Sequence, residues 1–310
     1  MLIIGDLHLK NKEPFLSSQQ NLLQFIEQNY PDEILIFLGD IFDNSSPHWE
    51  VYKIFKQFLI THKNKIFLLT GNHDFSRIKG NVLQPFTLLS NVIVIDNIVN
   101  IEIENKKCLF IPFIQSQYEY NNLKGQFDYI FCHVTPEKYQ FYNEGVSFKN
   151  IKNSYIIYGH YHIQKDIYED ENYNKHHIIG VPIETRNGEN QKHKIIYIKD
   201  TLQEISLPLY FTFENIQYGE FPKNKNNILN IKNAPSLKAV YELYKGYYIR
   251  EEGIEINRSQ SLEIDDITNK QHKSFNEITL QEKFKLFIDY KNINNEGVVK
   301  ECLLRISNNG

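Results

Sequence analysis

The chain has 310 residues, of which 41% are hydrophobic and 23% charged, a balance that is typical of a globular protein. Its formal net charge of −4 excludes binding to nucleic acid through a strongly basic overall field, although a local basic patch would suffice for such binding. Three scattered cysteines, with no signal peptide, lipidation motif or long apolar segment, favour reduced thiols and no membrane partner. We therefore expect a cytoplasmic protein, in the host cytoplasm if it is viral.

The first part of the chain alternates short apolar runs with amphipathic segments. Strands are expected at residues 2–4, 34–38 and 65–70. A helix is predicted near residues 17–29, and a second one follows Ser46 as its N-cap, with Pro47 at its first position. The order β-α-β-α-β with short links predicts a parallel sheet that is covered by helices.

Beyond residue 90 the pattern changes to closely spaced strands, with one helix-like segment at 116–124. The expected strands are 92–96, 101–104, 108–113, 128–134, 155–159, 166–169, 176–181, 194–199 and 202–207. The last two have the spacing of a β-hairpin. A second sheet packed on the first would account for this strand-rich half, and we therefore predict an α/β fold, a four-layer αββα sandwich.

A shift in composition at 208–222 indicates the start of a small C-terminal α/β cap that is rich in Asn and Lys. Strands are expected there at 239–244 and 247–250, and amphipathic helices at 280–290 and 298–306. We predict a main domain at 1–207, the cap at 208–276 and a pair of C-terminal helices at 277–310.

Polar residues that can bind a metal ion follow five of the predicted strands. Asp6 and His8 come directly after the first strand, and Asp40 comes after the second. The other candidates at strand ends are Asn72, His133, His160 and His162. Each alone would more often be an ordinary turn or core residue, but five such placements by chance are improbable. Open α/β sheets place ligands at the carboxyl ends of their strands, so we expect these side chains to meet.

The seven side chains comprise two carboxylates, four imidazoles and one amide oxygen, with no thiolate. This donor set suits hard or borderline ions such as Mn²⁺, Fe²⁺ or Zn²⁺. Asp6-x-His8 and His160-x-His162 each place two ligands on one face of an extended segment. Seven ligands are too many for one tetrahedral ion but suit two ions, which together could hold a phosphate and activate water.

Six other histidines lie away from these strand ends, and we assign them structural or surface roles. They are His48, His62, His176, His177, His193 and His272. The pair His176-His177 lies within a predicted strand, and we expect no carboxylate near it.

Five motifs resemble, in the same order, those of the calcineurin-like metallophosphoesterases. They are Asp6-x-His8, Gly39-Asp40, Gly71–Asp74, His133 and Gly159–His162. Three longer stretches, Gly5–Leu9, Gly39–Asp43 and Gly180–Glu189, are similar to the SbcD-type DNA repair nucleases. The small size and short cap resemble the phage recombination endonuclease subunits of that group. The resemblance covers about the first 200 residues, and the cap and C-terminal helices rest on architecture alone.

This resemblance implies a ligand set. Asp6, His8, Asp40 and His162 would hold one ion, and Asp40, Asn72, His133 and His160 the other, with Asp40 as the bridge. His73 would act on the phosphate as a catalytic residue and would not bind metal. Asp74 would orient His73 or its loop, or serve as a plain turn residue. Thr185 and Arg186 could contact phosphate from the rim.

The resemblance also implies two divalent ions, most often Mn²⁺, and a DNA nuclease with 3′-to-5′ exonuclease and single-strand endonuclease activity. Residues 1–207 would be the nuclease domain and the cap would bind DNA. The expected partners are DNA, an SbcC-type coiled-coil ATPase docked on the C-terminal helices, and a second copy in a homodimer. One alternative is a metallophosphoesterase that acts on a small cyclic nucleotide or dinucleotide, because its site would be identical. The other, a non-catalytic scaffold subunit, would be expected to have lost a ligand, and none is missing.

Overall fold

The structure is a computed structural model that describes residues 1–113, 120, 123–139, 145–186, 189, 193–208 and 211–256. Residues 1–255 form one compact unit. The predicted C-terminal helices at 277–310, His272 and Cys302 lie outside the described residues. No helix among the described residues is long and apolar enough to cross a membrane.

The first sheet has six strands in the order β14-β13-β1-β2-β3-β6. Their bounds are β1 (Leu2–Ile4), β2 (Leu35–Phe37), β3 (Ile66–Leu69), β6 (Val92–Ile95), β13 (Lys194–Ile198) and β14 (Leu202–Ser206). The four strands from β1 to β6 are parallel, and the predicted hairpin of β13 and β14 adds to β1 in the antiparallel sense. Because β1, β2 and β3 run in parallel, their carboxyl ends lie at the same edge of the sheet.

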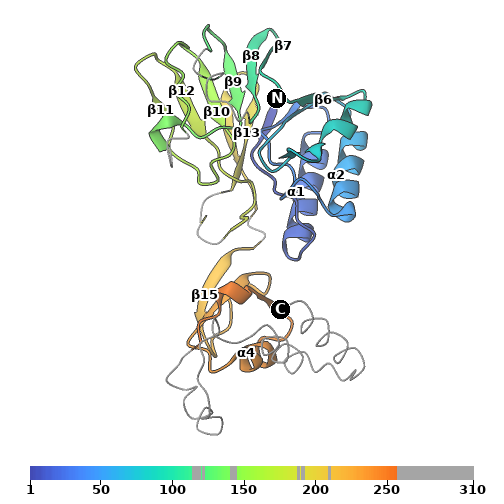
Figure 1. The fold of residues 1–310 in the computed structure, drawn as a ribbon, viewed down its shortest axis with the longest axis vertical. Helices are drawn as coiled ribbons and strands as arrows, with labels where there is room; N and C mark the ends of the chain where they lie inside the picture. Colours follow the sequence, from blue (N-terminus) through green and yellow to red (C-terminus); the bar gives the residue numbers. More distant parts are fainter. Residues whose placement is uncertain are drawn as a thin grey trace, which may run out of the picture. The chain divides into compact units, whose positions relative to one another are not determined.

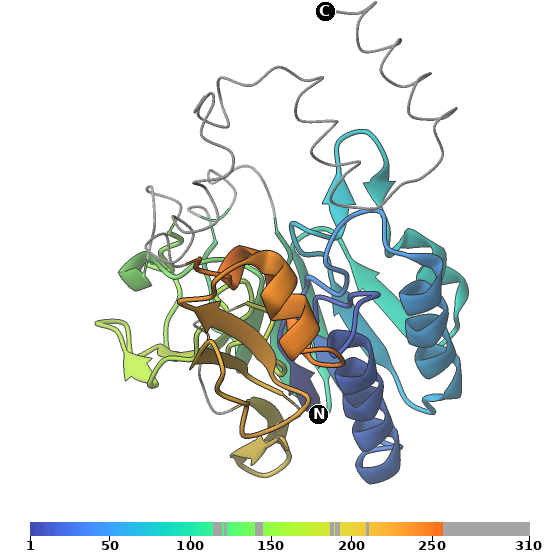
Figure 2. The same cartoon turned by 90° about the horizontal axis from the view of Figure 1, so that it is seen from below.

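Helices α1 (Phe15–Asn29) and α2 (Trp49–Thr61) lie side by side over the outer face of this sheet, as both ribbon views show (Figures 1 and 2). Their apolar faces pack on alternate side chains of the strands, such as Leu35 and Phe37. An aromatic cluster of Phe37, Phe42, Phe55, Phe58 and Phe86 fills the space between α2 and the first sheet.

The second sheet has the order β11-β12-β10-β9-β8-β7. Its strands are β7 (Val99–Ile103), β8 (Lys106–Ile111), β9 (Tyr129–Cys132), β10 (Tyr155–Tyr158), β11 (Tyr168–Glu169) and β12 (Lys175–Ile178). One core layer joins the inner faces of both sheets, for example Ile36 and Phe67 with Phe110 and Phe131. Every residue of β10 after Tyr155 is buried, as expected for a strand that is covered on both faces.

The face-to-face sheets and the helical layer over the first sheet confirm the predicted α/β sandwich. On the outer face of the second sheet, Ile130, Ile156 and Tyr158 pack against Phe148 and Ile151. The helix-like segment predicted at 116–124 lies largely outside the described residues. Short elements complete this unit: β4 (Phe75–Ser76), β5 (Gly80–Asn81), η1 (Gln84–Leu88) and η2 (Glu137–Tyr139).

The chain after residue 211 forms a small three-stranded sheet. Its elements are β15 (Phe213–Gln217), β16 (Ile228–Lys232), α4 (Leu237–Leu243), β17 (Tyr248–Ile249) and η3 (Glu251–Gly253). The strand predicted near 247–250 is confirmed as β17, but the strand predicted at 239–244 is wrong, because this segment belongs to α4. Ser236 caps the helix by accepting a hydrogen bond from the backbone N–H of Ala239 at 3.2 Å, and Val240 and Tyr244 bury one helical face.

The predicted start of α2 is also wrong. The helix begins at Trp49, and His48 is its N-cap, with Nδ1 accepting a hydrogen bond from the backbone N–H of Glu50 at 3.3 Å. Ser46 instead donates its backbone N–H to the side chain of Asn44, within the preceding turn. A Ser-Pro pair and a histidine two residues later both satisfy the local rules for a cap, and the turn at Asn44 selects the later start.

Phe55 tests how much the aromatic cluster contributes to stability. Its side chain is fully buried and meets the rings of Phe37, Phe42 and Phe86 at centroid distances of 5.6–5.8 Å. Phe55→Ala should lower the free energy of unfolding by about 3–5 kcal/mol, measured by urea denaturation. Ile60→Ala on the exposed side of the same helix is the control, and an equal loss there would show that the cluster is not the source.

Candidate metal centre

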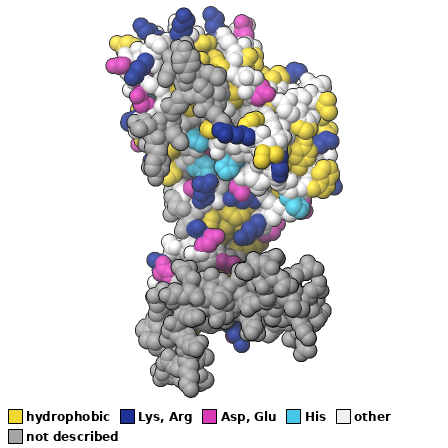
Figure 3. Space-filling model, viewed as in Figure 1, with side chains coloured by type: hydrophobic (Ala, Val, Ile, Leu, Met, Phe, Trp, Pro, Cys, Tyr) yellow, Lys and Arg dark blue, Asp and Glu magenta, His cyan; other side chains and the backbone are white. Residues whose placement is uncertain are grey.

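The structure brings all seven predicted ligands together at the carboxyl ends of β1, β2, β3, β9 and β10. Asp6, His8, Asp40 and His133 are buried, whereas the other three ligands are partly exposed at the rim. The space-filling view shows a group of histidine side chains on one face, with lysines around them (Figure 3). The site is therefore a buried cluster with an open side.

The first group of donors consists of Asp6, His8 and His162. The Nε2 atoms of the two histidines lie 3.0 Å apart, and His162 Nε2 is 3.7 Å from Asp6 Oδ2. One ligand atom from each residue lies within 4.8 Å of the others, which is close enough for the three to share one ion.

The second group consists of Asp40, His133 and His160, with Asn72 beside it. His133 Nε2 is 3.4 Å from Asp40 Oδ2, 3.3 Å from His160 Nδ1 and 3.1 Å from Asn72 Oδ1. The Oδ2 atom of Asp40 is also 3.5 Å from His8 Nε2 in the first group. One carboxylate oxygen therefore lies between the two groups of donors.

Backbone hydrogen bonds hold the strand ends in this arrangement. The N–H of His160 donates to Asp6 Oδ2 at 2.8 Å, and the N–H of His73 donates to Asp40 Oδ1 at 2.8 Å. His133 Nδ1 donates to the backbone carbonyl of Leu38 at 2.7 Å, which turns Nε2 toward the cluster. This last bond joins the second sheet to the first at the site.

Three of the predicted ligands adopt a left-handed backbone, with φ values of 44° at His8, 46° at Asp40 and 72° at His160. Non-glycine residues rarely adopt this conformation, and its cost is tolerated mainly at functional sites. Space is also restricted around Asp40, since a Cβ on Gly71 would lie 2.1 Å from Asp40 Oδ1. Glycine is therefore required at position 71 for the close approach of the two loops.

Burial and charge shift the pKa values in opposite directions across the cluster. Burial alone would raise the pKa of Asp40, but the charge and hydrogen bond of His133 lower it below its ordinary value. Burial would lower the pKa of His133, yet the charges of Asp40 and Asp6 raise it to about 9. Burial and the charge of His133 lower the pKa of His160 to about 3, whereas burial raises the pKa of Asp6.

These donors fit divalent cations. Two buried carboxylates and four imidazoles converge, and within the described part of the chain the basic groups that lie beside Asp6 and Asp40 are imidazoles. Burying carboxylates without a strong counter-charge is costly, and a divalent ion would supply that charge. Two carboxylates shared among histidine nitrogens and an amide oxygen suit Mn²⁺, Fe²⁺ or Zn²⁺.

His73 lies at the edge of the cluster. Its Nδ1 donates to the backbone carbonyl of Asp43 at 2.6 Å, and its ring meets that of His8 edge-on at 4.8 Å. His8, Asp40 and His73 also form a third group whose ligand atoms lie within 4.8 Å of one another. The geometry therefore allows His73 to bind metal as well as phosphate, and its role as a residue that acts only on phosphate stays a prediction.

Asp74 is buried and does not contact the ring of His73. Its carboxylate accepts hydrogen bonds from the backbone N–H groups of Gly71, Ile41 and Phe42 at 3.0–3.2 Å. Burial raises the pKa of Asp74 to about 7. This side chain therefore holds the loop after β2 against the loop after β3, which matches the predicted loop-orienting role.

Glu189 is a site residue that the sequence analysis quoted only as part of a motif. Its Oε1 lies 2.7 Å from His162 Nδ1, and its other oxygen accepts the backbone N–H groups of Thr185 and Arg186 at 2.5 and 3.0 Å. The hydroxyl of Thr185 also donates to this carboxylate at 2.9 Å. Thr185, predicted to contact phosphate, is therefore engaged in holding Glu189, which in turn fixes the ring of His162 with Nε2 toward the cluster.

Asp43 and Lys10 form a second support that was not predicted. Asp43 Oδ1 is 3.5 Å from His8 Nδ1 and 3.2 Å from Lys10 Nζ, and Lys10 also donates to the carbonyl of Thr185 at 3.2 Å. Asp43 belongs to the motif Gly39–Asp43, and its position three residues after the ligand Asp40 is the sequence feature that could have indicated its role.

The assignment of His176 and His177 was right in outcome but wrong in one reason. Asp170 Oδ2 lies 3.1 Å from His176 Nε2, and Glu204 Oε1 lies 3.3 Å from His177 Nε2, so carboxylates are close to both. Neither belongs to the donor groups of the metal centre. Asp170 lies six residues before His176 in the chain, and Glu204 comes from β14, which is distant in the sequence.

Substitutions of Asp40 and His8 test whether Asp40 is shared by both donor groups while His8 serves only the first. Asp40→Ala should abolish binding in both groups because Oδ2 lies between them, whereas His8→Ala should weaken mainly the first. Metal content after Mn²⁺ loading and desalting measures the difference. Retention of two ions by Asp40→Ala would contradict the shared role.

Glu189 tests whether a residue that orients a ligand, without being a ligand itself, contributes to metal affinity. Glu189→Gln removes the charge that orients His162, and metal affinity should fall roughly 10–100-fold, measured by calorimetric titration with Mn²⁺. Glu171→Gln, at an exposed acid away from the site, is the matched control. An unchanged affinity in Glu189→Gln would show that His162 is held adequately without the carboxylate.

Comparison with known proteins agrees with this arrangement. The model of the calcineurin-like phosphoesterase family matches residues 1–164, which is more than half of the chain. An archaeal phosphodiesterase structure is similar at 18% identity and a TM-score of 0.40, over 66% of this chain and 98% of that one. A protein of unknown function from Aquifex aeolicus is similar at 16% identity and a TM-score of 0.27, over 47% and 82% of the two chains. No curated protein matches the sequence. The chain belongs to the calcineurin-like phosphoesterase family and is a metal-dependent phosphoester hydrolase.

Proposed function

We propose that this phosphoesterase is a DNA nuclease of the SbcD type that uses two divalent ions, most often Mn²⁺. The position of one Asp40 oxygen, 3.5 Å from His8 Nε2 and 3.4 Å from His133 Nε2, carries the two-ion part of the proposal. In this assignment the first ion is held by Asp6, His8, Asp40 and His162. The second is held by Asp40, Asn72, His133 and His160.

When bound, such a pair of ions holds a phosphate and supplies an activated water for in-line attack. The protein's own contribution is to fix the donors: His133 through Leu38, His162 through Glu189, and Asp40 through the N–H of His73. The Nδ1–H of His73 is used by the carbonyl of Asp43, which leaves Nε2 to exchange a proton with the leaving oxygen. The donors are held by their protein partners before a substrate arrives, which lowers the cost of orienting them.

The motifs that resemble SbcD-type nucleases support DNA as the substrate, and two of them now have structural roles. The stretch Gly180–Glu189 supplies the carboxylate that orients His162, and Gly39–Asp43 supplies the Asp43 carboxylate beside His8. The cap gives weaker support, since Lys232, Lys238 and Arg250, three of the six basic residues within its described part, are paired with nearby glutamates.

That pairing is the observation that favours the alternative, a phosphodiesterase that acts on a small cyclic nucleotide or dinucleotide. The metal centre itself would be the same in both enzymes. We also propose, from the resemblance alone, that the nuclease works in recombination and break repair as a homodimer with a coiled-coil ATPase. The segment predicted to dock the ATPase lies outside the described residues.

The test compares substrates under one condition. Labelled duplex, hairpin and single-stranded DNA are incubated with protein and Mn²⁺, beside a cyclic dinucleotide. Cleavage of DNA with release of nucleotides from 3′ ends is expected, and Asp40→Ala should be inactive. Hydrolysis of the cyclic dinucleotide with intact DNA would establish the alternative.

His73 tests the catalytic assignment. If it acts on the phosphate, His73→Asn should retain the metal content and lose turnover by about 10²–10⁴-fold. Loss of one ion from this variant would instead place His73 among the ligands, as the group with His8 and Asp40 allows.

A further inference from the structure

A row of tyrosines and lysines starts at Tyr161, the residue between His160 and His162 in the chain, and continues through ring contacts away from it. We name it the tyrosine–lysine ladder; it consists of Tyr161, Tyr139, Tyr168, Lys165 and Lys138. Tyr161 stands between the two predicted ligands of the His160-x-His162 motif. The other members come from η2, from β11 and from the segment that follows His162. Residues from three parts of the chain thus form one continuous feature.

The members of the ladder alternate in space. The ring of Tyr139 lies 5.8 Å from that of Tyr161 and 6.1 Å from that of Tyr168, measured between centroids. Lys165 Nζ lies 5.4–5.5 Å from the rings of Tyr139 and Tyr161. Lys138 Nζ lies 4.1 Å from the ring of Tyr168 and 5.6 Å from that of Tyr139. Each ammonium group therefore lies between two tyrosine rings.

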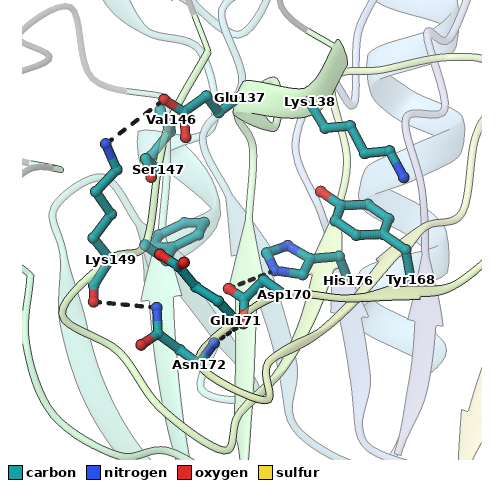
Figure 4. Close-up of a pocket in the computed structure, with 11 residues that line it drawn as sticks. Glu137, Lys138, Val146, Ser147, Lys149, Tyr168, Asp170, Glu171, Asn172 and His176 are labelled. Atoms are coloured by element: carbon teal, nitrogen blue, oxygen red, sulfur yellow. Dashed lines mark hydrogen bonds and ion pairs between the residues drawn. The ribbon is translucent and has the colours of Figure 1, made fainter.

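The ladder ends at a pocket of about 380 Å³, within the size range of small-ligand sites, roughly 300–1,000 Å³. Lys138 and Tyr168 stand on one side of it, and Lys149, paired with Glu137, stands on the other (Figure 4). The ring of Tyr168 is stacked on that of His176, with centroids 4.5 Å apart and an angle of 3° between the planes. This stack holds Tyr168 in a fixed orientation at the mouth of the pocket.

Asp170 and His176, which line the pocket, are held by hydrogen bonds, whereas the lysines of the ladder contact tyrosine rings. His176 bonds to Tyr158 Oη at 2.7 Å and to Asp170 at 3.1 Å, and Asp170 also accepts hydrogen bonds from Asn172 and Asn174. Among the described residues, no carboxylate forms an ion pair with Lys138 or Lys165. Asp170 and His176 in the pocket are therefore engaged with each other and with their neighbours, whereas the charges of Lys138 and Lys165 are not neutralised by a carboxylate of the described residues.

Alternating cations and aromatic rings are the pattern with which proteins bind single-stranded nucleic acid. Ammonium groups meet the phosphates, and bases stack on rings regardless of their sequence. A duplex cannot use such rings, because its bases are stacked on one another. Tyr139 and Tyr161 with two lysines match a short stretch of an unpaired strand, and the pocket offers space for a base beyond Tyr168, whose ring is already stacked on His176.

We propose that the tyrosine–lysine ladder binds single-stranded DNA next to the metal centre and that the pocket beyond Tyr168 receives one of its bases. This inference rests on the proposed nuclease function and adds to it the path that the strand follows. Tyr161 is the residue between the predicted ligands His160 and His162 in the chain, so a strand that is bound along the ladder and continues past Tyr161 would bring a phosphate to the donors. An unpaired strand would then be held by more contacts than a duplex.

Binding is measured without cleavage, by fluorescence anisotropy of a labelled oligothymidylate of about 15 nucleotides in EDTA. Tyr139→Ala and Tyr168→Ala should each weaken binding on the order of 10-fold, and Tyr139→Phe should restore it, because stacking needs the ring and not the hydroxyl. Tyr173→Ala, at a tyrosine that is 69% exposed outside the ladder, is the matched control and should bind normally.

The lysines allow a second measurement, the salt dependence of binding, with substitutions that do not disturb the packed core. In Lys138→Gln/Lys165→Gln, the slope of log affinity against log salt concentration should fall by about 1.4, because each phosphate contact contributes about 0.7 for single strands. Lys175→Gln, an exposed lysine on β12, should keep the slope. These are surface substitutions, so this test remains valid if a tyrosine variant fails to fold.

The two proposals fail in different ways. If the wild-type protein cleaves DNA but the ladder variants bind oligothymidylate with wild-type affinity and salt slope, the ladder inference is wrong and the nuclease stands. If the wild-type protein neither binds nor cleaves DNA but hydrolyses bis(4-nitrophenyl) phosphate, the nuclease proposal is wrong and the ladder inference falls with it. A weaker effect of the variants on hairpin DNA than on the single strand would support an unpaired strand as the ligand.

Discussion

The structure depends on placing one carboxylate oxygen, Oδ2 of Asp40, between histidines from the two sheets. His8 belongs to the first sheet and His133 to the second, and both present Nε2 within 3.5 Å of that oxygen. The layer of apolar side chains between the sheets sets their separation, and the bond from His133 to the carbonyl of Leu38 fixes their relative position at the site. A shift of either sheet by one residue would move donors to the opposite face, because side chains alternate along strands.

This constraint explains why the ligands could be predicted from the sequence and their supports could not. Strands that are buried on both faces are continuous apolar runs, so their ends are visible, and the polar residue after each run is evident. The seven predicted donors meet in the structure for this reason. Glu189 is different, because it lies in an irregular segment and reaches His162 from 27 residues away. Nothing in local periodicity signals that contact.

The errors in the predicted fold also arise from contacts that the local sequence does not reveal. The predicted strand at 239–244 contains a valine and two tyrosines, which favour strands, but burial of Val240 and Tyr244 on one face selects a helix. At the start of α2, two local caps compete and the turn at Asn44 selects the later one. Strands β15 and β16 were missed since alternation is weak in them. In each case tertiary contacts outweigh a local preference, as expected for short elements.

The metal centre concentrates features that oppose folding. Three left-handed non-glycine residues, buried carboxylates and a buried Asp74 with a pKa raised to about 7 all lie within a few residues of the strand ends. Each strained residue costs about 1–3 kcal/mol, and the carboxylates lose hydration. The aromatic cluster under α2 and the apolar layer between the sheets offset these costs without the metal. Bound cations would offset the cost of burying the carboxylates but would not relieve the backbone strain. The strain therefore remains as the cost of positioning the donors.

The ladder has no such strain, because its residues adopt ordinary backbone conformations and its rings are held by packing. Substitutions in the ladder should therefore leave the backbone that positions the donors unchanged.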